Sequence, residues 1–219
     1  MLFGGQDKTE FLGDTWLWNG RSWSTVPGTG PPARTGAGMS FDPATGSLIL
    51  VGGFNPDHFM NDTWKWNGTS WRALTPRFIL PSLTGASLAY SSTLGKLILF
   101  GGQGGMGVPF NDTTWAWDGT NWSYVPMSPS PLPRAFASMA SVPGGGPILL
   151  FGGWSKESGS VLGDTWTLAS AWSQNTQTPA PSPRENASLA SDPSSNSLLL
   201  IGGDDARGNR MADTWARGP

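Results

Sequence analysis

The chain has 219 residues, of which 13% are charged, and its formal net charge at pH 7 is −2. A nucleic-acid-binding protein needs a basic surface to neutralise phosphates, so this balance argues against a nucleic-acid partner. The chain has no cysteine, which excludes disulfides, thiolate nucleophiles and zinc–thiolate sites. It also has no apolar run of roughly 18 residues, so we expect no insertion into a membrane.

The composition indicates an all-β fold. Glycine and proline are abundant, with 31 and 19 residues, yet the chain also contains 13 tryptophans. Disordered chains are poor in aromatic residues, so these glycines and prolines indicate frequent turns within a folded protein. Frequent turns together with large aromatic side chains are typical of an all-β repeat protein.

An apolar segment that ends in two glycines recurs along the chain. It is LFGG at residues 2–5, LVGG at 50–53, LFGG at 99–102 and 150–153, and LIGG at 200–203. A spacing of about fifty residues indicates a repeat architecture. We expect these glycines to end a strand where other backbone comes close. The structural glycines predicted in this way are Gly4, Gly5, Gly52, Gly53, Gly101, Gly102, Gly152, Gly153, Gly202 and Gly203.

A second motif, Asp-Thr-Trp, keeps the same period. It appears at residues 14–16, 62–64, 164–166 and 213–215, and as DTTW at 112–115. Further tryptophans follow in each copy except the last, so twelve of the thirteen occupy repeat positions and only Trp154 does not. We therefore expect tryptophan to be mainly architectural. The structural set comprises Trp16, Trp64, Trp115, Trp166 and Trp215, and Trp18 and Trp117 are expected to pack between adjacent sheets as well.

Each repeat is predicted to contain four strands. In the second copy these are TGAGMSFD (35–42), SLILVGG (47–53), DTWKW (62–66) and SWRAL (70–74). The units are approximately 1–33, 34–82, 83–133, 134–183 and 184–219, and they form a single domain. The first unit lacks strand one and the last lacks strand four.

These motifs resemble the kelch repeat, in which an apolar strand ends in Gly-Gly and a variable loop leads to an aromatic strand and a spaced tryptophan. The resemblance covers essentially the whole chain. It implies a β-propeller built of four-stranded antiparallel blades. Kelch repeats often carry arginine at the first strand. Arg34, Arg134 and Arg184 match it, whereas Leu83 does not.

Two interpretations of the incomplete units remain open. The chain is either a segment of a longer kelch propeller, or a five-bladed ring with two deficient blades that is closed by itself or by another copy. Incomplete blades expose strand edges, which favours self-association through the terminal blades.

Candidates for catalysis are few. Asp57 and His58 could form an acid–base pair, but a single exposed histidine gives little support for an enzyme. The acidic residues of 204–213 lack the spacing of a calcium loop, so we expect no metal and no cofactor. The kelch-type propeller of galactose oxidase carries a copper site of tyrosines, histidines and a cysteine, and this chain, with two tyrosines, one histidine and no cysteine, cannot build it. The aspartates of the Asp-Thr-Trp motifs are expected to be structural, capping turns or accepting backbone N–H groups.

The remaining candidates lie in loops. The connections between strands two and three and between strand four and the next strand one are expected to emerge on the same face. Variable loops on a repeated scaffold are where repeat proteins place recognition. The candidate binding residues are Asp57, His58, Phe59, Arg77, Phe78, Phe110, Trp154, Lys156, Asp205, Arg207 and Arg210.

The sequence therefore predicts a non-enzymatic module that binds a protein partner through this face. One alternative is a glycan-binding propeller in which Phe59, Phe78, Phe110 or Trp154 stacks on sugar rings. Another is the propeller domain of a larger enzyme whose catalytic residues lie outside this chain. We expect Trp64→Ala to lower the melting temperature sharply and Trp154→Ala to leave it almost unchanged.

Five N-x-S/T sites favour an extracellular or cell-surface location, with the cytoplasm as the alternative. The candidate glycosylation sites are Asn61, Asn67, Asn111, Asn121 and Asn186.

Overall fold

The computed structural model describes residues 1–105, 109–176 and 178–218, which form five antiparallel sheets of three or four strands and one two-stranded sheet. We call these sheets blades 1 to 5 in chain order. Blade 1 contains β1 (Leu2–Gln6), β2 (Phe11–Trp18) and β3 (Trp23–Thr25). Blade 2 contains β4 (Gly38–Asp42), β5 (Ser47–Val51), β6 (Thr63–Trp66) and β7 (Trp71–Leu74). Blade 3 contains β8 (Ser87–Ser91), β9 (Lys96–Phe100), β10 (Thr114–Trp117) and β11 (Trp122–Val125).

Blade 4 contains β12 (Ser138–Ser141), β13 (Ile148–Phe151), β16 (Thr165–Leu168) and β17 (Trp172–Asn175). A two-stranded extension, β14 (Trp154–Ser155) and β15 (Ser160–Val161), accompanies it, and a short 3-10 turn (Pro143–Gly145) precedes β13. Blade 5 contains β18 (Ser188–Asp192), β19 (Ser197–Ile201) and β20 (Thr214–Arg217).

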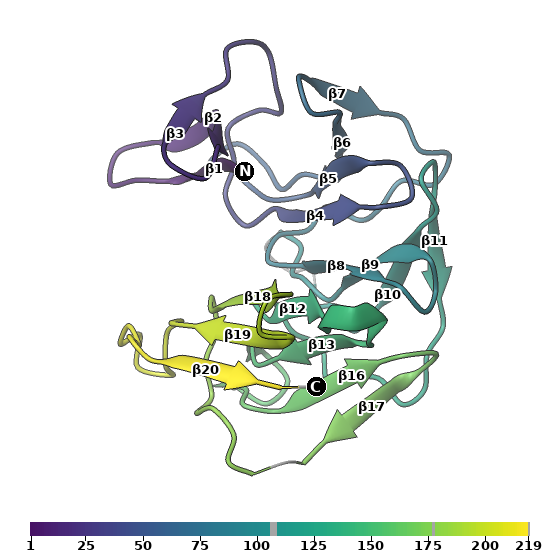
Figure 1. The fold of residues 1–219 in the computed structure, drawn as a ribbon, viewed down its shortest axis with the longest axis vertical. Helices are drawn as coiled ribbons and strands as arrows, with labels where there is room; N and C mark the ends of the chain where they lie inside the picture. Colours follow the sequence, from purple (N-terminus) through teal and green to yellow (C-terminus); the bar gives the residue numbers. More distant parts are fainter. Residues whose placement is uncertain (106–108, 177, 219) are drawn as a thin grey trace.

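The blades are those of a five-bladed β-propeller, as the repeats predict. Successive strands pair with each other, and the inner strands β4, β8, β12 and β18 lie next to one another around the centre. Short side chains allow this approach: Ser87 Oγ donates to the Ala137 carbonyl at 2.7 Å, and Ser138 Oγ donates to the Ala187 carbonyl at 2.6 Å. Blades 2 to 4 have four strands, and blades 1 and 5 have three. Figure 1 shows the blades as an arc that is open between blade 1 and blade 5.

The hydrophobic core lies between successive blades. Ile49 and Val51 of β5 pack against a cluster that includes Leu97, Leu99 and Trp115 of blade 3, and all are buried. Similar clusters join blade 3 to blade 4 and blade 4 to blade 5. The second strands of blades 2 to 4, β5, β9 and β13, are therefore buried on both faces, which explains their continuous runs of apolar residues.

Two tryptophans of blade 1 differ from the sequence-based expectation. Trp18 and Trp23 are 48% and 50% exposed, whereas Trp66, which corresponds to Trp18 in blade 2, is 5% exposed. Trp16 is half-buried. The prediction that Trp18 packs between two sheets is wrong, because among the described residues no blade covers this side of blade 1.

The glycine pairs lie where two blades meet. In blades 1 to 4 the second glycine of the pair donates its N–H to the segment that begins the next blade, as from Gly53 to the Leu83 carbonyl and from Gly102 to the Arg134 carbonyl, both at 2.8 Å. The first glycine has a positive φ, and a Cβ added at Gly101 would lie 2.5 Å from the Arg134 carbonyl oxygen. Only glycine allows both this backbone conformation and this approach.

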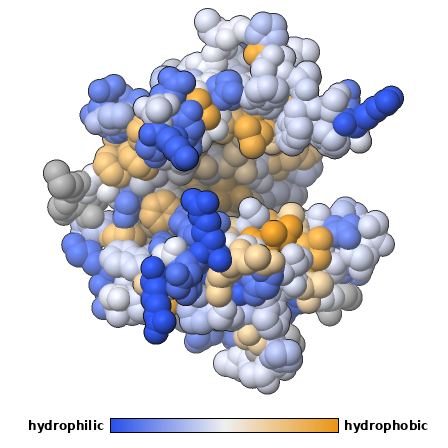
Figure 2. Space-filling view, turned by 90° about the vertical axis from the view of Figure 1, so that its left-hand side faces the viewer, coloured by the Kyte–Doolittle hydropathy of each residue, from blue (hydrophilic) through white to orange (hydrophobic). Residues whose placement is uncertain are grey.

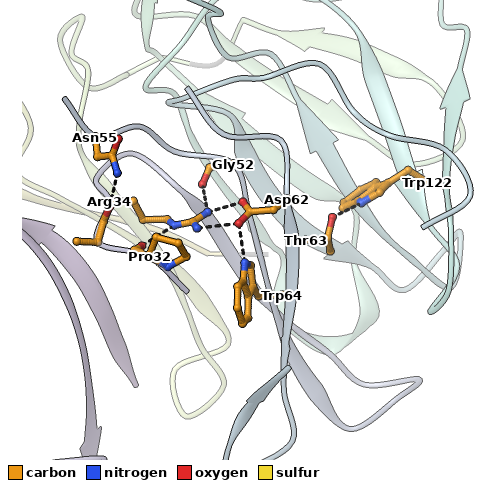
Figure 3. A network of polar contacts seen from close by, with 9 residues as sticks. Pro32, Arg34, Gly52, Asn55, Asp62, Thr63, Trp64 and Trp122 are labelled. Carbon is orange, nitrogen blue, oxygen red and sulfur yellow. Dashed lines mark hydrogen bonds and ion pairs between the residues drawn. The ribbon is translucent and has the colours of Figure 1, made fainter. Parts of the chain in front are cut away.

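A buried arginine ties the same junction together (Figure 3). The Arg34 guanidinium donates to the Gly52 carbonyl at 2.9 Å and to the two carboxylate oxygens of Asp62 at 2.5 and 2.8 Å. The indole of Trp64 also donates to Asp62, at 2.6 Å. Burial raises the pKa of Asp62, but the hydrogen bonds from Arg34 and Trp64 outweigh it, so the pKa lies below its ordinary value.

This arrangement is repeated in the pairs Arg134–Asp164 and Arg184–Asp213. In blade 3 both partners change together: Leu83 replaces the arginine, and Thr113, which accepts the Trp115 indole N–H at 3.1 Å, replaces the aspartate. The aspartates of these pairs have a structural role. Their carboxylates accept hydrogen bonds from the guanidinium and indole groups, however, and do not cap turns. In the third copy Thr113 takes this position, and Asp112 is exposed.

Candidate binding face

The connections between strands two and three extend each blade beyond its glycine pair. Phe54 forms β-bridges with Thr35 on one side and Phe59 on the other. Blades 3 and 5 repeat these bridges, and in blade 4 Trp154 pairs with Ala135 and, through β14 and β15, with Val161. The binding face is therefore built on ordered β-structure rather than on loose loops.

Aromatic side chains line this extension over blades 1 to 4. The rings of Phe11 and Phe54 lie 5.5 Å apart, those of Phe54 and Phe59 are stacked at 5.5 Å, and those of Phe110 and Trp154 lie 5.1 Å apart. All five residues are half-buried. We call Phe11, Phe54, Phe59, Phe110 and Trp154 the aromatic row.

Over blade 5 the face becomes charged. Asp204 bridges to Glu185 and to Arg210 at the positions that carry Phe54, Thr35 and Phe59 in blade 2. Burial raises the pKa of Glu185, and the charge of Asp204 raises it further. The face thus joins an aromatic part to a charged part within one repeated framework.

The tips of three connections are ordered by the same type of side chain–backbone hydrogen bond. A side-chain oxygen two residues after the second glycine accepts two backbone N–H groups. Asp7 accepts from Thr9 and Glu10 at 2.7 Å each, and Asn55 accepts from Asp57 and His58 at 3.1 and 3.2 Å. In blade 5, Asp205 accepts from Arg207 and Asn209 at 2.8 Å. These turns order the tips through local hydrogen bonds within each connection.

The structure brings most of the predicted binding residues to this face. Asp57, His58 and Lys156 are exposed at the tips, and Arg207 and Arg210 are exposed on blade 5, where Asp205 is half-buried. Phe59, Phe110 and Trp154 belong to the aromatic row.

Arg77 and Phe78 lie elsewhere. The Arg77 N–H donates to Asn121 Oδ1 at 2.7 Å, in the turn between β10 and β11, and the ring of Phe78 lies 5.2 Å from that of Trp115. Both contacts are to blade 3, at its third strand and at the turn that follows it. Arg77 therefore lies at the turn between strands three and four of blade 3 rather than beside Phe59, and its assignment to that face is wrong.

Trp154 also has a different setting from the predicted loop. Its backbone N–H and carbonyl bond to Ala135 at 2.8 and 3.0 Å, and its ring packs on Phe110. Sequence reasoning missed Phe11 and Phe54 in the aromatic row. For Phe54 a usable signal was present, because the residue after each glycine pair always continues the strand pairing.

The candidate glycosylation sites differ in accessibility. Asn61, Asn67 and Asn186 are exposed, whereas Asn111 and Asn121 are half-buried. Asn67 Oδ1 accepts N–H groups from Thr69 and Ser70 in a turn, which gives this asparagine a structural role as well.

Among residues 1–105, 109–176 and 178–218, no three His, Cys, Asp or Glu side chains gather in a way that could hold a metal ion. No helix within those residues is long and apolar enough to span a membrane.

The fold defines a class: a repeat-built five-bladed β-propeller whose strand 2–3 connections form an ordered face. No protein-family model matches the chain, and no curated protein matches it.

Proposed function

We propose that this chain is a non-enzymatic binding module that holds a protein partner on the face formed by its strand 2–3 connections. The observation that carries this proposal is the aromatic row, with exposed charged residues such as Asp57 and Lys156 around it. Protein interfaces commonly combine a central group of aromatic anchors with a polar rim. The resemblance to kelch propellers supports the same conclusion.

The test uses affinity capture with the full chain, followed by binding measurements with the purified partner. The variant His58→Ala/Lys156→Ala alters two exposed tips of the face. Arg21→Ala, in the exposed turn between β2 and β3, is the matched control. We expect the double variant to weaken binding by about threefold, because exposed rim residues contribute less than central aromatic anchors, and the control to bind as the wild type does. Equal affinities for all three proteins would contradict the proposal.

A glycan is the second candidate ligand, because the half-exposed rings of Phe59 and Trp154 present flat apolar surfaces. A glycan array separates the two candidates, since binding to glycans without capture of a protein favours the glycan. We also propose an extracellular or cell-surface location, supported by the exposed sites at Asn61, Asn67 and Asn186. An intact mass without glycan from protein recovered only in the cytosol would contradict that location.

A further inference from the structure

A groove of about 580 Å³ lies between the outer strands of blade 1 and blade 2. One wall is the connection from blade 1 to blade 2, at residues 26–30. The other wall is the turn before β7 together with the first residue of that strand, at residues 69–71. The described residues that line the groove all fall between Gly13 and Trp71, and none of them belongs to β1. Both walls are therefore complete within these two blades.

Small residues keep this groove open. Its connection carries Gly-Thr-Gly at residues 28–30, four to six residues before the repeated arginine position. The next connection carries Arg-Phe-Ile at the equivalent residues 77–79. There the backbone N–H of Arg77 donates to Asn121 Oδ1 at 2.7 Å, which ties the connection to the turn of blade 3. Between blades 1 and 2 the glycines leave the corresponding space unfilled.

The groove exposes part of one indole ring. Trp71 is half-buried, whereas the equivalent Trp122 and Trp172 are each 2% exposed. The indole N–H of Trp71 donates to Thr15 Oγ1 at 2.9 Å, which fixes the orientation of the ring. A Cβ added at Gly30 would lie 3.1 Å from Cδ1 of this indole, so the connection passes close to the ring without placing a side chain on it. Trp71 thus provides a fixed aromatic platform.

Hydroxyl groups surround this platform. Thr29, Thr69 and Ser70 line the groove and are exposed. Thr69 Oγ1 donates to Asn67 Oδ1 at 3.0 Å, whereas the hydroxyls of Thr29 and Ser70 have no hydrogen-bond partner among the described residues. A hydroxyl both donates and accepts, so these groups can bond to the hydroxyls of a ligand in either direction.

The charge of the lining restricts the chemistry of the ligand. Among the described residues that form the groove there is no lysine, arginine or histidine, and Asp14 is the charged one. Phosphate and carboxylate groups are bound most strongly by cations, so this lining disfavours an anionic ligand. A fixed indole surrounded by hydroxyls suits the ring of a neutral sugar, which has an apolar C–H face and a polar hydroxyl edge.

We propose that the groove between blades 1 and 2 is a binding site for a neutral saccharide. One sugar ring packs its C–H face on the indole of Trp71, and its hydroxyls bond to those of Thr29 and Ser70. This site contains no residue of the aromatic row and does not rest on the proposed function.

The experiment measures binding of four neutral disaccharides to the full chain by saturation-transfer difference NMR and titration calorimetry. The probes are maltose, cellobiose, lactose and N,N′-diacetylchitobiose. We expect at least one of them to bind saturably, with the strongest transfer to the C–H protons of one ring face. An acidic disaccharide of glucuronic acid and N-acetylglucosamine should bind about tenfold more weakly, because its carboxylate meets the like charge of Asp14.

Two variants locate the sugar. Thr29→Phe places in the groove the residue that the next connection carries at this position, and it should abolish saturable binding. The matched control Thr75→Phe makes the same change at an exposed position that does not line the groove, and it should bind as the wild type does. Melting temperatures close to that of the wild type confirm that both variants are folded.

Absence of saturable binding by all four neutral disaccharides would overturn the proposal, as would an acidic disaccharide that binds as tightly as the neutral ones. Undiminished binding by Thr29→Phe would place the sugar elsewhere on the molecule, and the assignment to this groove would fail. Equal losses in Thr29→Phe and Thr75→Phe would contradict it as well.

Discussion

The indoles of Trp117 and Trp122 differ in one respect that can be measured. Both are almost fully buried, with 1% and 2% exposed. Trp122 Nε1 donates to Thr63, whereas Trp117 Nε1 has no hydrogen-bond partner within the described residues. The same change to phenylalanine therefore removes a hydrogen bond at one position and a buried unsatisfied N–H at the other. We expect Trp122→Phe to lower the free energy of unfolding by about 1 kcal/mol more than Trp117→Phe does. Urea denaturation measures the difference, and equal losses would contradict it.

The buried ion pairs have an apolar counterpart within the same chain. Asp164→Thr leaves the guanidinium of Arg134 buried without its carboxylate, which should cost about 3–5 kcal/mol. Adding Arg134→Leu reproduces the combination of Leu83 and Thr113 in blade 3, so we expect the double variant to recover most of that loss. Chemical denaturation of both variants provides the comparison. A double variant no more stable than the single one would show that the Leu83 arrangement depends on other features of blade 3.

The same pairs make stability depend on pH. Burial opposes ionisation of Asp164, but the Arg134 guanidinium outweighs it and holds its pKa below the ordinary value. In Asp213 the hydrogen bond from Arg184 lowers the pKa likewise. A lowered pKa contributes stability that is present above the unfolded-state pKa of about 4 and is lost as the pH falls through the folded-state value. We expect the melting temperature to fall steeply below about pH 4, and to fall less in the double variant Arg134→Leu/Asp164→Thr.

The glycine at the end of each second strand shows how one strand constrains the next blade. Gly101 and Gly95 both have positive φ, 73° and 64°, but a Cβ at Gly95 would meet nothing within 4 Å. At Gly101 it would lie 2.5 Å from the Arg134 carbonyl oxygen. Both alanine variants carry the strain of the left-handed conformation, roughly 1–2 kcal/mol. Only Gly101→Ala also forces blade 4 away from blade 3. We expect its melting temperature to be clearly the lower of the two, and similar values would argue against a tight junction.

The strands could be predicted from the sequence because each is marked by a local residue pattern that recurs in every repeat. The apolar run before Gly52 and the motif at Asp62 each determine one strand, and their period orders the blades. The binding face could be predicted only in part. The pairing of Phe54 with Thr35 joins residues from two connections, and Phe78 packs on Trp115 of blade 3. Such placements depend on contacts between segments rather than on the residues of one segment.

The two ends of the arc present surfaces that are interior everywhere else in the molecule. Figure 2 looks into the opening and shows a hollow between the upper and lower parts, with apolar side chains on its walls. On blade 1, Leu2, Trp18 and Trp23 are about half exposed, and the rings of Trp18 and Trp23 lie 5.5 Å apart. An exposed apolar patch of this kind favours association.

We therefore expect the protein to self-associate with increasing concentration through this patch on blade 1. The variant Trp18→Gln/Trp23→Gln should shift the sedimentation profile toward monomer and reduce binding of a hydrophobic dye. Its stability should change by no more than about 1 kcal/mol, because little area is lost from a buried interface. The matched change Trp66→Gln, at the position of Trp18 in blade 2, places a polar group in the core and should destabilise by more than about 3 kcal/mol. If Trp18→Gln/Trp23→Gln proved as destabilising as Trp66→Gln, the blade 1 face would be covered in solution and the patch would not be a free surface.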